Sequence, residues 1–193
     1  MQLVLTPPTR NLSIPNEDAR AVDLEDSNLF ALNRFPGYDR WEDGSRITYG
    51  AEWNFDRGLW SIQSVIGQSF RITRRPGIFP DGTGLTDRLS DVVGRTRVRY
   101  GRFVDLTHRY RVDKDNLAVR RNEVDLTLGT NQSYVQLGYL RLDRNIDVGI
   151  EDLRDKEELR VAGRLKFLHY WSVFAATVLD LTSSREDPVS DAR

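Results

Sequence analysis

Several residue types that carry chemistry are rare or missing in this chain of 193 residues. It contains no cysteine, which excludes disulfides and thiol catalysis within the sequence given. Its only two histidines are His108 and His169, and neither belongs to an HExxH or paired-histidine motif. We therefore expect no metal and no other cofactor.

The chain also lacks an excess of positive or negative charge, and it lacks long apolar runs. Lys and Arg number 28 against 29 Asp and Glu, a net charge of -1, so we expect no nucleic-acid partner. Mean hydropathy is -0.52, and no apolar run approaches the ~20 residues of a membrane-spanning helix. These features do not exclude a membrane barrel, whose strands need only about 9 to 11 residues and expose every second side chain to lipid.

Catalytic motifs are equally scarce. Acidic pairs such as Glu25/Asp26 and Glu42/Asp43 lie mostly in predicted loops, where carboxylates are normally solvated, although two carboxylates suffice for glycoside hydrolysis. The run Asp81-Gly82-Thr83-Gly84 lacks the lysine and the strand-to-helix context of a phosphate-binding loop. The sequence indicates that the protein is not an enzyme.

Alternation of apolar and polar residues is the dominant pattern. From Arg46 to Phe55, residues such as Ile47, Tyr49 and Trp53 share one side and Thr48 shares the other, which is typical of a half-buried strand. The pattern recurs along the chain and predicts an all-β fold, an antiparallel up-and-down meander. The whole of 1–193 is expected to be one partial barrel domain with a long loop at 7–45 and strands at about 46–56, 60–72, 92–100, 103–112, 118–129, 133–142, 157–168 and 172–182.

The alternation divides the predicted strands into a wet and an oily face. For a barrel, we expect the wet side chains to face the lumen and the oily ones to face lipid. The residues assigned to the lumen are Glu52, Arg97, Asp105, Arg109, Glu123, Asp125, Arg160 and Arg164. Those assigned to lipid are Ile47, Tyr49, Trp53, Leu126, Leu128, Leu165 and Phe167. The wet face is equally consistent with the solvated outside of an antiparallel sheet.

The lengths of the connections alternate as well. Short turns are predicted near 57–59, 101, 129–132 and 169–171, with longer connections between them, so the two ends of the sheet differ. Outer-membrane barrels have this asymmetry. Lipocalin-like barrels and sandwiches share it, so a soluble β-barrel or sandwich that binds a ligand or glycan stays open as an alternative. In the long loop, Leu29, Phe30 and Phe35 are the expected packing anchors.

Two stretches resemble a known family. The first runs from Asp26 through Asn28-Leu29-Phe30, Asn33-Arg34-Phe35, Gly37 and Asp39-Arg40 to Thr48-Tyr49-Gly50, and the second includes Tyr110-Arg111, Asp113 and Arg120-Arg121-Asn122-Glu123. Together they resemble the carboxy-terminal barrel of the LPS-assembly outer-membrane proteins of the LptD family (also called OstA or Imp). The likeness covers essentially the whole chain.

This resemblance implies a location, a role and partners. The location is the cell outer membrane, and the role is insertion of lipopolysaccharide into its outer leaflet without covalent chemistry. The implied partners are lipopolysaccharide, a plug lipoprotein of the LptE type inside the barrel, and a periplasmic bridge protein of the LptA type, reached through an N-terminal domain that this sequence lacks. The family's disulfide cysteines are absent here. Because the sequence shows no signal peptide and ends in a loop-like stretch, we expect an excerpt of a longer chain.

Overall fold

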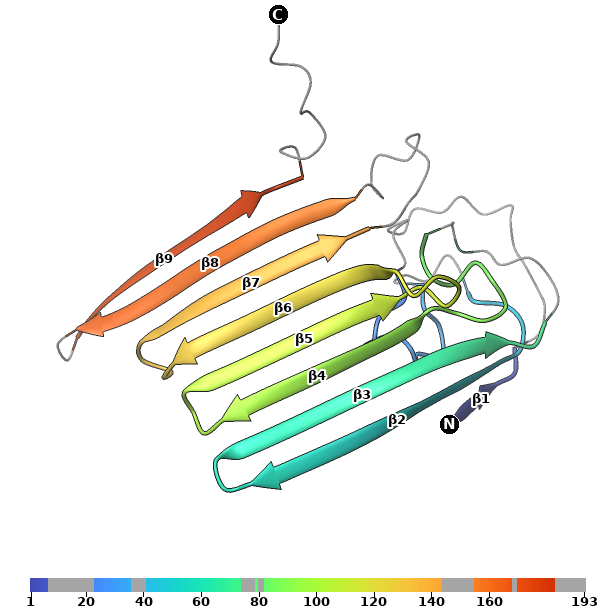
Figure 1. Ribbon diagram of the computed structural model, residues 1–193, viewed down its shortest axis with the longest axis horizontal. Coiled ribbons are helices and arrows are strands. Elements are labelled where there is room, and N and C mark those ends of the chain that lie inside the picture. Colours follow the sequence, from blue (N-terminus) through green and yellow to red (C-terminus); the bar gives the residue numbers. More distant parts are fainter. Residues whose placement is uncertain are drawn as a thin grey trace, which may run out of the picture.

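The fold is an open sheet of nine antiparallel strands. The computed structural model describes residues 1–6, 23–35, 41–73, 79, 82–143, 155–167 and 170–182. The strands are β1 (Gln2–Val4), β2 (Arg46–Arg57), β3 (Trp60–Arg71), β4 (Val92–Tyr100), β5 (Val104–Val112), β6 (Val119–Gly129), β7 (Tyr134–Leu142), β8 (Lys156–Phe167) and β9 (Trp171–Asp180). Each strand pairs with its neighbours in the chain, in the order β1 to β9 (Figure 1). None of the described residues belongs to a helix long and apolar enough to span a bilayer.

The strand bounds follow the alternation in the sequence closely. The largest difference lies at the end of β9, which stops at Asp180, two residues before the expected 182. The expected end of the preceding strand, at 168, lies outside the described residues, as do 7–22 and 36–40 of the predicted long loop. The all-β antiparallel meander predicted from the sequence is confirmed.

The two ends of the sheet have different connections. At one end, the turn end, Gly58 and Leu59 join β2 to β3, and residues 101–103 join β4 to β5. Gly58 and Gly101 have φ of 59° and 53°, a left-handed conformation that glycine adopts without strain. At the other end, the loop end, 5–45, 72–91, 113–118 and 143–155 connect the strands. The predicted alternation of short and long connections is therefore present.

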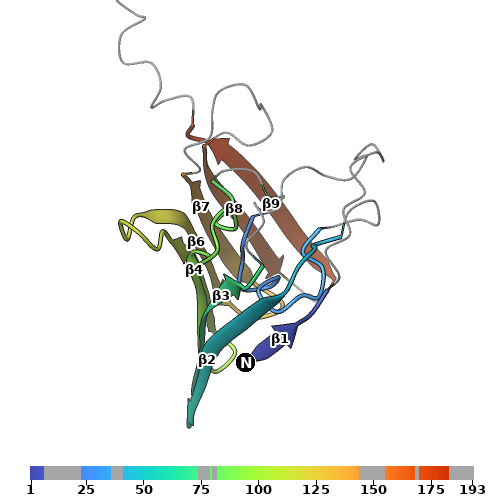
Figure 2. The same ribbon diagram turned by 90° about the vertical axis from the view of Figure 1, so that its right-hand side faces the viewer.

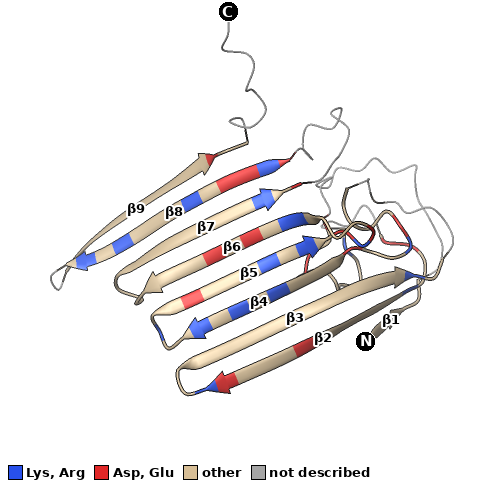
Figure 3. Cartoon of the chain, viewed as in Figure 1, with Lys and Arg blue, Asp and Glu red and all other residues tan. Residues whose placement is uncertain are grey.

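The register assigns every strand residue to one of two faces. Directly opposed residues share a face, and one set runs unbroken from Trp53 through Ser64, Thr96 and His108 to Val124. We call its face the apolar face. The opposite or polar face includes Glu52 on β2, Arg95, Arg97 and Arg99 on β4, Asp105, Arg109 and Arg111 on β5, Arg121, Glu123 and Asp125 on β6, and Glu158, Arg160 and Arg164 on β8. Figure 3 shows charge concentrated on β4, β5, β6 and β8.

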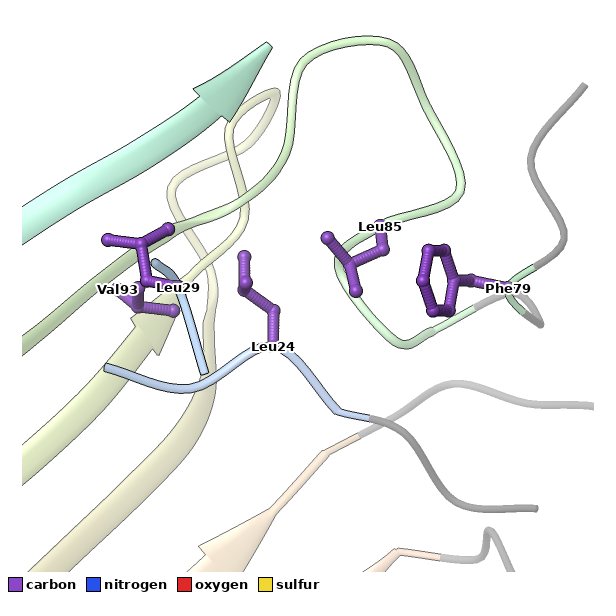
Figure 4. Packing of buried hydrophobic residues seen from close by; sticks show 5 residues of the cluster. All are labelled: Leu24, Leu29, Phe79, Leu85 and Val93. Carbon is purple, nitrogen blue, oxygen red and sulfur yellow. The ribbon is translucent and has the colours of Figure 1, made fainter. Parts of the chain in front are cut away.

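The buried core lies at the loop end, on the polar face. It consists of Leu24 and Leu29 from the loop after β1, Phe79 and Leu85 from the loop after β3, and Val93 of β4 (Figure 4). The loop segments sit on the concave side of the curved sheet (Figure 2). The fold therefore covers its polar face at one end and leaves the apolar face uncovered by the described residues.

Of the three expected loop anchors, Leu29 belongs to this core and Phe35 packs against it. Leu29 is 1% exposed and Phe35 packs against the cluster, with its ring stacked on Phe79 at 4.9 Å between centroids. Phe30 is 40% exposed and lies outside the cluster. Leu24, fully buried, was not singled out by the sequence pattern.

Candidate functional site

The polar face brings together all eight residues that the sequence assigns to a lumen. Glu52 lies on β2, Arg97 on β4, Asp105 and Arg109 on β5, Glu123 and Asp125 on β6, and Arg160 and Arg164 on β8. The seven residues assigned to lipid, Ile47, Tyr49, Trp53, Leu126, Leu128, Leu165 and Phe167, all lie on the apolar face. Which face meets a lumen and which meets lipid stays a prediction.

Ion pairs connect the polar face across several strands. Arg109 Nη1 lies 3.1 Å from both Glu123 Oε1 and Asp125 Oδ2. Asp125 also lies 3.8 Å from Arg160, and Glu123 accepts a hydrogen bond from Arg121 at 2.7 Å. Most of these side chains are partly exposed, so each single pair contributes little to stability, typically about 0.2 to 1 kcal/mol. Together they hold the charged side chains in a defined array.

A glycine lets this network cross β7. Gly138 lies between Asp125 on β6 and Arg160 on β8 in the register. A Cβ atom at Gly138 would lie 3.1 Å from Asp125 Oδ1 and 3.3 Å from Arg160 Nε, tighter than ordinary contacts. The absence of a side chain therefore allows a pair between strands that are not neighbours.

Nearer the loop end, the polar face is covered by loop residues that neutralise its arginines. Arg111 is 1% exposed, and its guanidinium donates to the Thr83 and Gly82 carbonyls at 2.8 and 2.7 Å. The same guanidinium pairs with Asp23 at 3.3 Å and Asp91 at 3.5 Å. Burial raises the pKa of Asp91, and Arg111 opposes this rise. Arg111 is thus the point at which two loops are fixed to the sheet.

A second buried ionic cluster closes the corner where β2 begins. Glu42 pairs with Arg34 at 3.0 Å and with Arg46 at 2.8 Å, and all three side chains are at most 9% exposed. Burial lowers the pKa of Arg34 to about 10, although Glu42 opposes the change. Burial likewise raises the pKa of Glu42, against the attraction of Arg34 and Arg46. This cluster holds the chain entering β2 against segment 23–35.

A polar cavity of about 250 Å³ lies between the loops at 82–91 and 113–120. Its walls include Asp87, Asp113 and Lys114. The Asp113 carboxylate accepts hydrogen bonds from the Asp115 amide at 2.9 Å and from Arg120 Nη2 at 2.9 Å. The Asp115 amide, followed by Arg120, lowers the pKa of Asp113. The charged groups that line the cavity pair with one another. We therefore interpret the cavity as a place where the two loops contact each other.

The apolar face is exposed and bordered by aromatic side chains at both ends. Its members include Trp53, Leu165 and Val173, which are 53%, 61% and 57% exposed. At the turn end the aromatics are Phe55, Trp60, Tyr100, Phe167 and Trp171, and at the loop end they are Tyr49, Phe70, Tyr110 and Tyr139. Two aromatic belts of this kind occur where a membrane barrel meets the headgroups.

The distance between the belts fits that comparison. Trp60 and Phe70 stand ten positions apart on β3 (70 minus 60). At about 3.3 Å per residue they are roughly 33 Å apart along the strand. A tilt of about 45° reduces this to about 23 Å along the barrel axis, close to the typical band of about 25 Å.

Two pairs of polar side chains near the middle of the apolar face contact each other. His108 Nε2 lies 2.9 Å from Asn122 Oδ1, and the Ser64 and Thr96 hydroxyls are 3.0 Å apart. Among the described residues, no group of three or more His, Asp or Glu is arranged to hold a metal ion. His169, the other histidine, lies outside them.

The chain is similar in sequence to proteins of a known family. A family model described as LptD, LPS transport system D, matches residues 1–171. The LPS-assembly protein LptD of Nitrosococcus oceani is 27% identical over 165 residues, which cover 83% of this chain and 21% of that protein. The chain thus spans about a fifth of the length of this relative. Because the family model matches far more than half of the sequence, the chain belongs to the LptD family.

Proposed function

We propose that this chain forms part of the wall of an outer-membrane β-barrel that inserts lipopolysaccharide into the outer leaflet of the Gram-negative outer membrane. The proposed activity is transport, and no covalent bond is made or broken. Its partners are lipopolysaccharide, a plug lipoprotein of the LptE type in the lumen, and a periplasmic bridge of the LptA type that docks on a domain outside this chain. The family assignment and the name of the relative support this role.

The main observation behind the proposal is that the described loops cover the polar face of the sheet and not the apolar face. In a soluble sheet protein the apolar face is the one that other elements bury, because exposed apolar area is unfavourable in water. Here the described loops pack on the polar face, and the apolar face exposes Trp53, Leu165 and Val173. Lipid is the environment in which such a face is stable, and a polar lumen then lies behind it.

The asymmetry of the sheet supports an orientation. Outer-membrane barrels have short periplasmic turns and longer external loops. We therefore place the turn end, with Gly58 and Gly101, in the periplasm and the loop end, with the core around Leu24 and Leu29, at the cell surface. In this orientation the buried loop cluster lies over the external mouth of the lumen.

Depletion of the full-length protein in its own bacterium tests the role. We expect newly made lipopolysaccharide to stop reaching the cell surface, measured by its accessibility to a surface-acting lipid A deacylase in the outer membrane. A plasmid copy of the full-length gene should restore delivery. Normal surface delivery after complete depletion would refute the proposal.

Electrophoresis of the full-length protein separates the membrane barrel from a soluble barrel or sandwich. A membrane barrel should partition into detergent and migrate faster before boiling than after it. A monodisperse protein in detergent-free buffer, with the same mobility before and after heating, would favour the soluble alternative.

A further inference from the structure

Two pairs of arginines face each other directly on the polar face. The register places Arg95 of β4 opposite Arg109 of β5, and Arg111 of β5 opposite Arg121 of β6. Like charges directly opposite each other destabilise a sheet. A protein that keeps four arginines in this arrangement needs anions beside them.

Three acids from one short loop segment supply part of that charge. Asp23 pairs with Arg111 at 3.3 Å, Glu25 with Arg121 at 2.7 Å, and Asp26 lies 3.3 Å from Arg95 and 3.9 Å from Arg109. Asp26 thus bridges one of the two opposed arginine pairs. The segment is held to the sheet by these ion pairs and by the packing of Leu24 and Leu29.

Exposure differs between the two halves of this arrangement. The Arg111 and Asp23 side chains are 1% and 7% exposed, so their pair is closed to solvent. The side chains of Arg95 and Arg109 are 43% and 33% exposed, whereas Asp26, which they hold, is only 6% exposed. Arg109 Nη1 also lies 3.1 Å from both Glu123 and Asp125, so an anion approaching along the open part of the polar face reaches Arg95 and the Nε side of Arg109, which faces Asp26, without disturbing the buried pair.

We propose that Arg95 and Arg109 form an anion-binding site for phosphate groups carried on a saccharide, and that Asp26 occupies this site in the unloaded protein. Guanidinium groups bind phosphate through paired, charge-assisted hydrogen bonds, as they bind a carboxylate. A phosphate that takes the place of Asp26 removes one of the contacts that hold this segment to the polar face, while the Asp23–Arg111 pair and the packing of Leu24 and Leu29 remain. The segment around Asp26 is then held less tightly when phosphate is bound.

The inference rests on the proposed function, since it takes the phosphorylated saccharide of lipopolysaccharide as the cargo that passes this face. The structural part of the argument is independent of it. Asp26 and a phosphate compete for the same two guanidinium groups, so removing the Asp26 charge must strengthen phosphate binding, whatever the protein transports.

The test uses the full-length purified protein in detergent, with glucose 6-phosphate as the probe and glucose as the neutral control at equal ionic strength. Hydrogen exchange of peptides covering 23–35 reports whether the segment is held, and titration calorimetry reports binding. We expect glucose 6-phosphate to speed exchange in this segment severalfold and glucose to have no effect. Inorganic phosphate is titrated in parallel. An equal response to it shows that the phosphate group alone is recognised, and a weaker response shows that the sugar contributes.

Three variants make the competition specific. Asp26→Asn should bind glucose 6-phosphate about tenfold more tightly, because one charged competitor is gone. Arg95→Gln should abolish the response of the segment to phosphate. Asp87→Asn, which changes an exposed carboxylate paired with Lys114 in another loop, should behave as wild type.

Two results would overturn the site: exchange in 23–35 that glucose 6-phosphate leaves unchanged, or an affinity that Asp26→Asn fails to raise. Either result, together with a loss of lipopolysaccharide delivery on depletion of the protein, would remove the site and leave the proposed function standing. A phosphate response in a protein whose depletion spares lipopolysaccharide delivery would support the site and remove the proposed function.

Discussion

Arg111 shows how much one side chain connects at the loop end. Its guanidinium contacts Asp23 from one loop, and Asp91 and the Gly82 and Thr83 carbonyls from another, in a position closed to solvent. Removing one partner from a buried ionic group costs far more than removing an exposed pair, because the remaining charges keep their desolvation penalty.

The described loop residues 23–35 and 82–91, which pack on the polar face, form the loop cover. We therefore expect Arg111→Gln to destabilise this loop cover by about 3 to 5 kcal/mol. It should also raise the pKa of Asp91 further, since the opposing positive charge is lost. Hydrogen exchange of residues 82–91 measures the first effect. Arg99→Gln is the control, because Arg99 lies on the same face near the turn end, opposite Asp105, and its partly exposed side chain donates a 3.4 Å hydrogen bond to Ser61. Equal costs for the two variants would contradict the assigned role.

Asp113 predicts a dependence of loop stability on acid. Its pKa is lowered by the Asp115 amide and by Arg120, so its ionised form favours the folded loop. This stabilisation is present above the ordinary aspartate value of about 3.9 and is lost as the pH falls through the lowered native pKa. NMR titration of the Asp113 carboxyl carbon should show the lowered midpoint.

The control for this prediction is Asp113→Asn. The variant should flatten the acid dependence of hydrogen exchange at residues 115–118, since the titrating group is gone. A midpoint at or above the ordinary aspartate value in the wild-type protein would contradict the prediction.

At the scale of single residues, the sequence predicted which face of a strand a side chain lies on, but not contacts between residues far apart in the chain. The alternation assigned Arg109 and Glu123 to one face, because strand periodicity is a local property. The pairing of Glu25 with Arg121, 96 residues apart, has no local signal. A clue was the hairpin register, which places Arg111 opposite Arg121 and so requires a counter-charge nearby.

At the scale of elements, the strands were predictable and the loop cover was not. Eight strands followed from the period-two pattern, to within two residues at the described ends. The cluster of Leu24, Leu85 and Val93 joins two loops and a strand, and its members share no repeat in the sequence. Irregular segments pack through contacts that only the folded chain defines, so Leu29 was foreseen and Leu24 was not.

Leu29 lies directly against Gly67 of β3. A Cβ atom there would lie 2.5 Å from Leu29 Cδ2 and 2.8 Å from the Tyr49 carbonyl oxygen. Gly67→Ala should therefore push the segment at Leu29 off the polar face and cost about 1 to 3 kcal/mol, as overpacking does. Hydrogen exchange of residues 26–31 would measure it.

Gly163 of β8 provides the matched control. The nearest atom to a Cβ at Gly163 is the Tyr134 carbonyl oxygen at 3.6 Å, an ordinary contact. Gly163→Ala should leave exchange in the loop unchanged. A similar loss of loop protection in both variants would mean that the contact with Leu29 does not hold the cover in place.

At the scale of the whole molecule, the two faces make the strongest prediction. Leu126 lies on the apolar face and its neighbour Asp125 on the polar face. A polar substitution should therefore destabilise the protein at Leu126 far more than at Asp125. Leu126→Arg should cost about 2 to 4 kcal/mol if it lies near the membrane middle. Asp125→Asn, on a side chain 43% exposed, should cost about 1 kcal/mol or less.

Reversible unfolding of the full-length protein in lipid vesicles compares these two variants directly. The wild-type protein in the same vesicles sets the reference free energy. Equal tolerance of Leu126→Arg and Asp125→Asn would mean that the apolar face does not meet lipid, and the orientation of the wall would have to be reversed or abandoned.

The spacing of the aromatic belts bears on where such a wall is stable. An apolar band of about 23 Å, from Trp60 to Phe70, matches a thin bilayer. In an average membrane, with about 30 Å of hydrocarbon, the band would be several ångströms too short, and each ångström of hydrophobic mismatch costs a fraction of a kcal/mol. The bacterial outer membrane is thinner than average. Under the proposed function, the distance between the two aromatic belts therefore favours the thin outer membrane over a bilayer of average thickness.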